Sequence, residues 1–69
     1  MSMKITEEEK LRLQVTTFQG GQNAWDYALT WSEEDRPWII AGILSCMRKG
    51  YNLNPLMVNW EARDLRSRY

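Results

Sequence analysis

The longest apolar stretch of the chain covers residues 38–47 almost without a break. On a helix its apolar side chains occupy most of the circumference, and a helix that is apolar all round is buried. Asp35 is a favourable capping residue and leaves Pro37 in the first turn, where proline is tolerated. Gly50 supplies the left-handed residue that commonly ends a helix. The pattern therefore predicts a central helix over residues 36–49.

A second helix is predicted over residues 55–68. Asn54 is a capping residue, and Pro55 follows at the first helical position, where a missing N–H is tolerated. Apolar residues then form one stripe at helical spacing: Val58, Ala62, Leu65 and Tyr69. We expect this stripe to pack on the central helix, in which Gly42 leaves room for a close crossing. Three further apolar residues fall on the opposite side: Leu56, Met57 and Trp60.

The N-terminal part of the chain contains a capping box. The Thr6 hydroxyl can accept from the Glu9 amide, and the Glu9 carboxylate can accept from the Thr6 amide. Apolar residues then recur at helical spacing: Leu11, Val15 and Phe18. Residues 11–18 also alternate between apolar and polar, as a strand does. The capping box favours the helix.

Gly20 and Gly21 interrupt this pattern, and either end the first helix or form a hinge within a longer one. A short helical segment follows over residues 23–31, with three apolar residues on one face: Trp25, Ala28 and Leu29. The sequence as a whole predicts an all-α fold, a small bundle of three or four short helices. We expect residues 1–69 to form a single domain.

A chain of 69 residues buries a small core and is marginally stable alone. Such domains usually gain support from disulfides, a metal or oligomerisation. Cys46 is the only cysteine and there is no histidine, which excludes an internal disulfide and argues against a structural zinc site. Self-association or the binding of a partner remains, and of these the sequence predicts a homodimer.

Two signals of location are missing from the sequence. No apolar stretch follows residues 1–4 before the acidic run at 7–9, so we expect no signal peptide. The apolar run over residues 38–47 is too short for a membrane helix, which needs about 20 residues. With a single cysteine, these features predict a cytoplasmic protein that does not enter a membrane.

Charge is distributed unevenly although the net charge is zero. Residues 1–35 carry three basic and seven acidic side chains, a net charge of −4, and residues 36–69 carry six basic and two acidic, a net charge of +4. Either half could steer a partner of opposite sign, or two copies could pair antiparallel. In a third interpretation the halves neutralise each other within one monomer.

The sequence predicts no catalytic, cofactor-binding or metal-binding residue and no small-molecule substrate, and therefore no enzyme. The acidic clusters at residues 7–9 and 33–35 fall where helix caps are expected. Cys46 has no histidine to activate it and lies in the most apolar helix, which indicates a buried structural thiol. The serines equally lack the histidine of a catalytic triad.

Four tryptophans point to contact surfaces instead. We expect Trp25, Trp31 and Trp38 to be core residues. Trp60 faces away from the stripe of the last helix and is the best candidate for an interface residue. The predicted partner-binding residues are Leu56, Met57, Trp60, Arg63, Arg66 and Arg68, with the arginines steering an acidic partner.

The sequence therefore predicts a small non-enzymatic protein that binds a partner protein and modulates or inhibits it by occupying a surface. Small chains of this kind commonly act as inhibitors or adaptors, including those of phages and mobile elements. The alternative is a DNA-binding regulator, since residues 36–49, a short turn and residues 55–68 have the plan of a helix-turn-helix. Zero net charge and apolar residues at the start of the last helix count against it.

Overall fold

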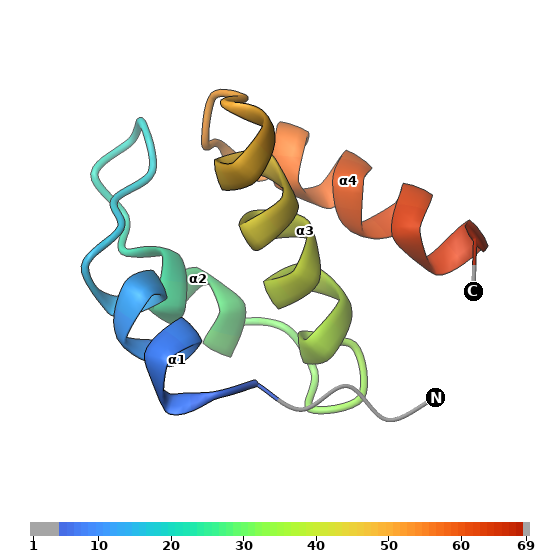
Figure 1. The fold of residues 1–69 in the computed structure, drawn as a ribbon, viewed down its shortest axis with the longest axis horizontal. Helices are drawn as coiled ribbons and strands as arrows, with labels where there is room; N and C mark the ends of the chain where they lie inside the picture. The colour runs from blue at the N-terminus through green and yellow to red at the C-terminus, as the bar shows by residue number, and fades with distance from the viewer. Residues whose placement is uncertain (1–4, 69) are drawn as a thin grey trace.

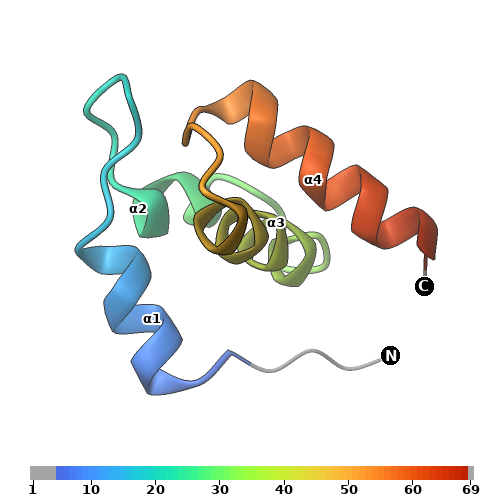
Figure 2. The ribbon, with the colours of Figure 1, turned by 45° about the horizontal axis from the view of Figure 1, so that its top comes forward.

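The computed structural model describes residues 5–68 and confirms the predicted all-α fold (Figure 1). Within these residues the chain forms four helices: α1 (Glu7–Gln14), α2 (Ala24–Leu29), α3 (Arg36–Lys49) and α4 (Pro55–Arg68). In both ribbon views α3 lies between the pair α1 and α2 on one side and α4 on the other (Figures 1 and 2). No helix in the described part of the chain has the length and apolarity needed to cross a membrane.

The capping box predicted at the start of α1 is present. The Glu9 amide donates to the Thr6 hydroxyl at 3.1 Å, and the Thr6 amide donates to the Glu9 carboxylate at 3.0 Å. The predicted apolar stripe was wrong at two positions, because the side chains of Leu11 and Val15 are 58% and 81% exposed. Leu13 enters the core instead.

α1 ends at Gln14, four residues earlier than the helical spacing up to Phe18 predicted. The backbone of the following residues bonds to the segment before α2: the Phe18 amide donates to the Gln22 carbonyl at 2.7 Å, and the Ala24 amide to the Thr16 carbonyl at 2.9 Å. These bonds hold a tight loop in which Gly21 has a φ of 89°, a backbone conformation that favours glycine. Phe18 belongs to this loop, and its side chain is buried in the core.

α2 begins after Asn23, whose side-chain oxygen accepts from the amides of Trp25 and Asp26 at 3.0 and 3.2 Å. It is shorter than predicted and buries Ala24 and Ala28. Leu29 is exposed, which corrects the expectation that it shares the buried face.

The end of α2 is tied to the start of α3 by Arg36. Its guanidinium group donates to the carbonyls of Ala28 at 3.2 Å and Trp31 at 2.9 Å. The Ala28 carbonyl, in the last turn of α2, also accepts from the Trp31 amide at 3.2 Å, whereas the Trp31 carbonyl belongs to the loop that follows the helix. The contact links the end of α2 to the first residue of α3.

α3 follows the predicted boundaries. Asp35 stands at the cap position but its side chain makes no capping bond, and the turn before the helix is closed by Ser32, whose hydroxyl accepts from the Asp35 amide at 3.2 Å. Gly50 ends the helix with a φ of 75°, as expected. Trp38 is half-buried, which corrects the expectation that it is a core residue.

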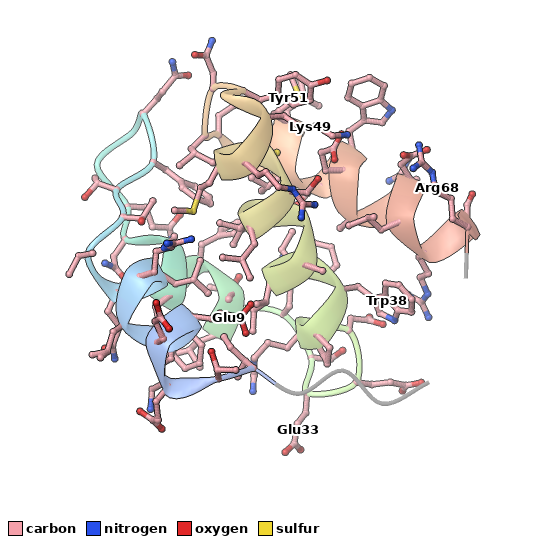
Figure 3. The ribbon with its side chains drawn as sticks, in the orientation of Figure 1. Glu9, Glu33, Trp38, Lys49, Tyr51 and Arg68 are labelled. Atoms are coloured by element: carbon pink, nitrogen blue, oxygen red, sulfur yellow. The ribbon has the colours of Figure 1, made fainter. Side chains whose placement is uncertain are left out.

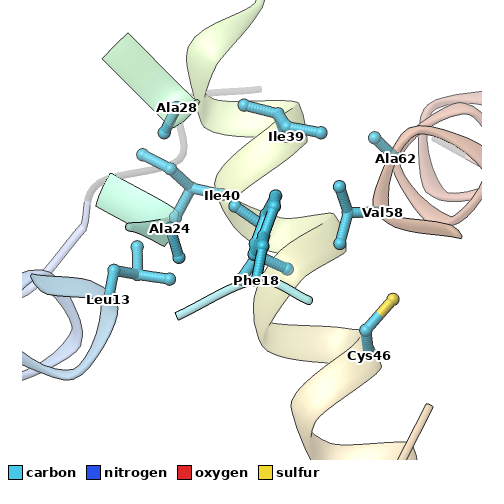
Figure 4. Close-up of a cluster of buried hydrophobic side chains, with 10 residues drawn as sticks. Leu13, Phe18, Ala24, Ala28, Ile39, Ile40, Cys46, Val58 and Ala62 are labelled. Carbon is cyan, nitrogen blue, oxygen red and sulfur yellow. The ribbon is translucent and has the colours of Figure 1, made fainter. Parts of the chain in front are cut away.

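α3 and α4 cross closely at Gly42. A Cβ atom at this position would lie 2.8 Å from the Val58 carbonyl oxygen and 2.9 Å from the Ala62 amide nitrogen. The core is built on both sides of α3: Leu13, Ala24 and Ala28 lie on one side, and Val58 and Ala62 on the other (Figure 4). The small side chains of α2 and α4 allow these helices to approach α3.

Candidate partner-binding surface

α4 packs on α3 and is capped and hydrogen-bonded to the rest of the fold. The Asn54 side chain accepts from the Met57 amide at 2.8 Å and caps the helix. The Tyr27 hydroxyl donates to the Asn59 side chain at 2.8 Å and links α2 to α4. Val58 and Ala62 are buried, as the stripe predicted, and Leu65 is half-buried; the fourth member, Tyr69, lies outside the described residues.

Because successive residues of a helix are 100° apart, burial of positions 58 and 62 turns positions 56, 60 and 63 outward. We call the side chains of Leu56, Trp60 and Arg63 the outer face of α4. The Leu56 side chain is 82% exposed and the Trp60 side chain 61%. One helical turn separates these two large apolar groups, so they present one continuous apolar surface.

Met57, predicted as part of the contact patch, has a double role. Its side chain is half-buried and packs against the core cluster. It also lines a hollow of about 390 Å³, together with Leu56, Asn59, Trp60 and Arg63. Met57 therefore forms the buried part of the contact patch, and Leu56 and Trp60 form its exposed part.

The three arginines of α4 differ in their surroundings. Arg66 pairs with Asp35 at 3.0 Å, and Arg68 pairs with Asp64 at 3.0 Å. Arg63 is exposed and makes no ion pair with any residue between 5 and 68. The Arg66–Asp35 pair joins the basic half of the chain to the acidic half, so part of the charge is neutralised within the monomer.

A second hollow, of about 220 Å³, follows along α4 toward its C-terminal end. Its lining combines side chains of α4 with two tryptophans: Trp31, Trp38, Asn59, Ala62, Arg63 and Arg66. Figure 3 shows Trp38 on the side of α3 that faces the end of α4. Trp31 packs against the core cluster and also lines this hollow, and Trp38, expected in the core, contributes to the surface beside the predicted patch.

Glu61 is a buried carboxylate that the sequence analysis missed. The Ser45 hydroxyl donates to it at 2.8 Å, and the Lys49 ammonium group lies 3.2 Å away. The hydrogen bond from Ser45, followed by the contacts with Lys49, lowers the pKa of Glu61 although burial opposes this shift. Its position three residues after Val58 and four before Leu65 places it on the buried side of α4, which is the signal that could have revealed it.

Cys46 is fully buried, as predicted. Burial, together with the negative charge of Glu61, raises the pKa of its thiol to about 11. The thiol is therefore protonated at neutral pH, and a protonated thiol is a poor nucleophile.

A third hollow lies on the opposite side of α3, between α1, α2 and the start of α3. Its volume is about 350 Å³, and its lining includes the apolar residues Ile40 and Leu44 and the carboxylates of Glu9 and Glu33. Glu9 is engaged in the capping box, whereas Glu33 points away from the helices (Figure 3). The lining of this hollow thus carries two carboxylates and the Arg36 guanidinium group, whereas the outer face of α4, on the other side of α3, carries the charge of Arg63.

The described residues contain no group of three or more histidine, cysteine or acidic side chains arranged to hold a metal ion. Comparison of the chain with protein-family models, with curated proteins and with solved structures returns no match.

Proposed function

We propose that the chain is a small non-enzymatic protein-interaction module that binds a partner protein in the cytoplasm and modulates it by occupying a surface. The observation that carries the proposal is the exposure of Leu56 and Trp60, one turn apart on the outer face of α4. Large apolar side chains grouped on a surface mark interaction sites. Tryptophan is among the residues that contribute most to binding when a partner covers it.

The anchoring of α4 supports the same proposal. The cap at Asn54, the crossing at Gly42 and the Tyr27–Asn59 hydrogen bond fix the helix before any partner arrives. A surface that is already ordered loses less conformational entropy on binding.

The surroundings of the buried polar side chains also favour a role without catalysis. The Ser45 hydroxyl is committed to Glu61, and the Cys46 thiol has a pKa of about 11. Neither group is activated as a nucleophile would be.

Duplex DNA is the alternative ligand for residues 55–68. The ion pairs of Arg66 and Arg68 weaken the case for DNA binding. The carboxylates of Asp35 and Asp64 offset positive charges that contacts with DNA phosphates would use. The start of α4 presents Leu56 and Trp60 at the positions where a recognition helix presents polar base-reading groups.

The first prediction is that Trp60→Ala removes partner binding without unfolding the protein. The purified chain is immobilised and exposed to lysate of the cells that encode it, beside Trp60→Ala and a matched variant, Leu11→Ala. Trp60 and Leu11 are 61% and 58% exposed, so either change should cost little stability. We expect one protein to be retained by the unchanged chain and by Leu11→Ala, and about tenfold less by Trp60→Ala.

Circular dichroism of the three chains is the control for folding. Loss of helical signal in Trp60→Ala would place Trp60 among the residues that hold the fold together, against the proposal. If all three chains retained the same amount of the partner, the outer face of α4 would not be part of the binding surface. Retention of duplex DNA that falls steeply between low and physiological salt would support the regulator instead.

A further inference from the structure

Arg63 stands between two hollows along α4. On one side is the hollow of Leu56, Met57 and Trp60, and on the other the hollow of Trp31 and Trp38. Asn59 and Arg63 line both, so the two hollows follow each other along the helix. A partner lying along α4 would therefore meet the hollow of Leu56 and Trp60, then the Arg63 guanidinium group, and then a hollow in which two tryptophans stand beside Asn59 and Arg66.

The charged side chains that line the two hollows are arginines. No carboxylate is among the described residues that line either hollow. Asp35 and Asp64 offset the charges of Arg66 and Arg68 and leave that of Arg63 without a partner in residues 5–68. A guanidinium group beside apolar surface favours a carboxylate, with which it makes two parallel hydrogen bonds.

The opposite side of α3 has the reverse character. There the hollow of about 350 Å³ carries Glu9 and Glu33, and the guanidinium group of Arg36 is engaged by the carbonyls at the end of α2. Neutral carbonyls do not cancel the charge of Arg36, so the two carboxylates and one guanidinium group of this lining have a net charge of −1. An acidic partner is therefore favoured less on this side than on the outer face of α4. The contrast gives the molecule a means of orienting its partner.

We propose that the outer face of α4 binds an acidic amphipathic helix of the partner. This helix places a carboxylate on Arg63 and apolar side chains one turn before and one turn after it, in the two hollows. On the partner helix, each apolar residue would then lie three or four positions from the acidic residue, on the same face. The inference rests on the proposed function, because it names the kind of segment that the same surface binds. A single unpaired arginine between apolar hollows fits a carboxylate better than a nucleic-acid backbone, which needs many cations.

The test is a selection from random 16-residue peptides displayed on phage, with the purified full chain as the target. We expect the selected peptides to share an acidic residue with apolar residues three or four positions away on each side. Their affinity should fall on the order of tenfold for Arg63→Glu, which places like charges together. The matched control is Arg48→Glu, which makes the same change of net charge at an exposed position in the last turn of α3 and should leave affinity unchanged.

Three results would overturn the inference. One is a selection that yields no peptides, or peptides without the acidic residue. Another is equal binding to Arg63→Glu and Arg48→Glu, which would leave only a general effect of net charge. The third is a homodimer that Trp60→Ala splits, because a second copy would then cover this face. Since the selection needs no cellular partner, its outcome is independent of whether the lysate experiment captures a protein.

Discussion

Glu61 shows how one buried side chain couples the stability of this fold to pH. It accepts from Ser45 and faces Lys49, and these contacts hold its pKa below the ordinary value of 4.5. A carboxyl group with a lowered pKa in the folded state stabilises that state above the pKa of the unfolded chain. This contribution to stability is lost as the pH falls from about 4.5 through the lower pKa that Glu61 has in the folded state.

We therefore predict that Glu61→Gln lowers the free energy of unfolding at pH 7 and weakens its fall in acid. The loss at pH 7 should be about 1–2 kcal/mol, because a glutamine can keep a hydrogen bond to Ser45 but not the charge facing Lys49. Urea unfolding followed by circular dichroism at pH 7 and at pH 3.5 measures both effects. Glu34→Gln, at an exposed position, is the control; a Glu61→Gln chain with the pH dependence of the unchanged protein would refute the role of Glu61.

At the scale of the elements, the crossing of α3 and α4 depends on the absence of a side chain at Gly42. The atoms that a Cβ would meet are the Val58 carbonyl oxygen and the Ala62 amide nitrogen, which belong to the backbone of α4. A backbone cannot turn aside as a flexible side chain can. The helices would have to move apart and lose contacts of Val58 and Ala62.

Gly42→Ala should therefore destabilise the protein by about 1–3 kcal/mol, as overpacking of a core does. This loss of stability is opposite in sign to the gain that usually follows when alanine replaces glycine in a helix. Gly20→Ala is the matched control, because a Cβ there would meet no atom within 4 Å and the change should be nearly neutral. Equal urea midpoints for the two variants would show that the helices do not cross as closely as described.

Signals that are local in the sequence predicted the elements well. The capping box at Thr6, the Asn54–Pro55 start and the Gly50 terminator each depend on residues within one turn, and each stands where expected. Which side of a short helix is buried depends on distant elements. Leu13 is buried in place of Leu11 because α1 turns that side toward α2, a contact between separate elements.

On the surface, the direction of side chains was predictable from local spacing, but contacts between residues distant in the sequence were not. The outward direction of Leu56 and Trp60 followed from the stripe of α4 alone. The Arg66–Asp35 ion pair joins residues 31 positions apart, and helical spacing carries no information about such a contact. For the same reason helical spacing could not indicate that Arg63, unlike Arg66 and Arg68, makes no ion pair with any residue from 5 to 68.

At the scale of the whole molecule, the size of the chain still predicts a homodimer. Light scattering at low and moderate salt tests it, and we expect twice the 8.2 kDa of one chain at both. Trp60→Ala should have the same mass, because the outer face of α4 is assigned to a different protein. A mass of one chain would refute the dimer, and a dimer that dissociates only in Trp60→Ala would place the second copy on α4.

The central claim is that the outer face of α4 is the surface that contacts the partner protein. Photo-crosslinking in the cells that encode the chain tests it most directly, with benzoylphenylalanine in place of Leu56 or, as the control, of Val15. These side chains are 82% and 81% exposed and lie on different helices, so accidental encounters should label both equally. We predict a crosslink to one protein from position 56 that Trp60→Ala abolishes, and none from position 15. Equal labelling from both positions, or labelling from position 15 alone, would contradict the claim.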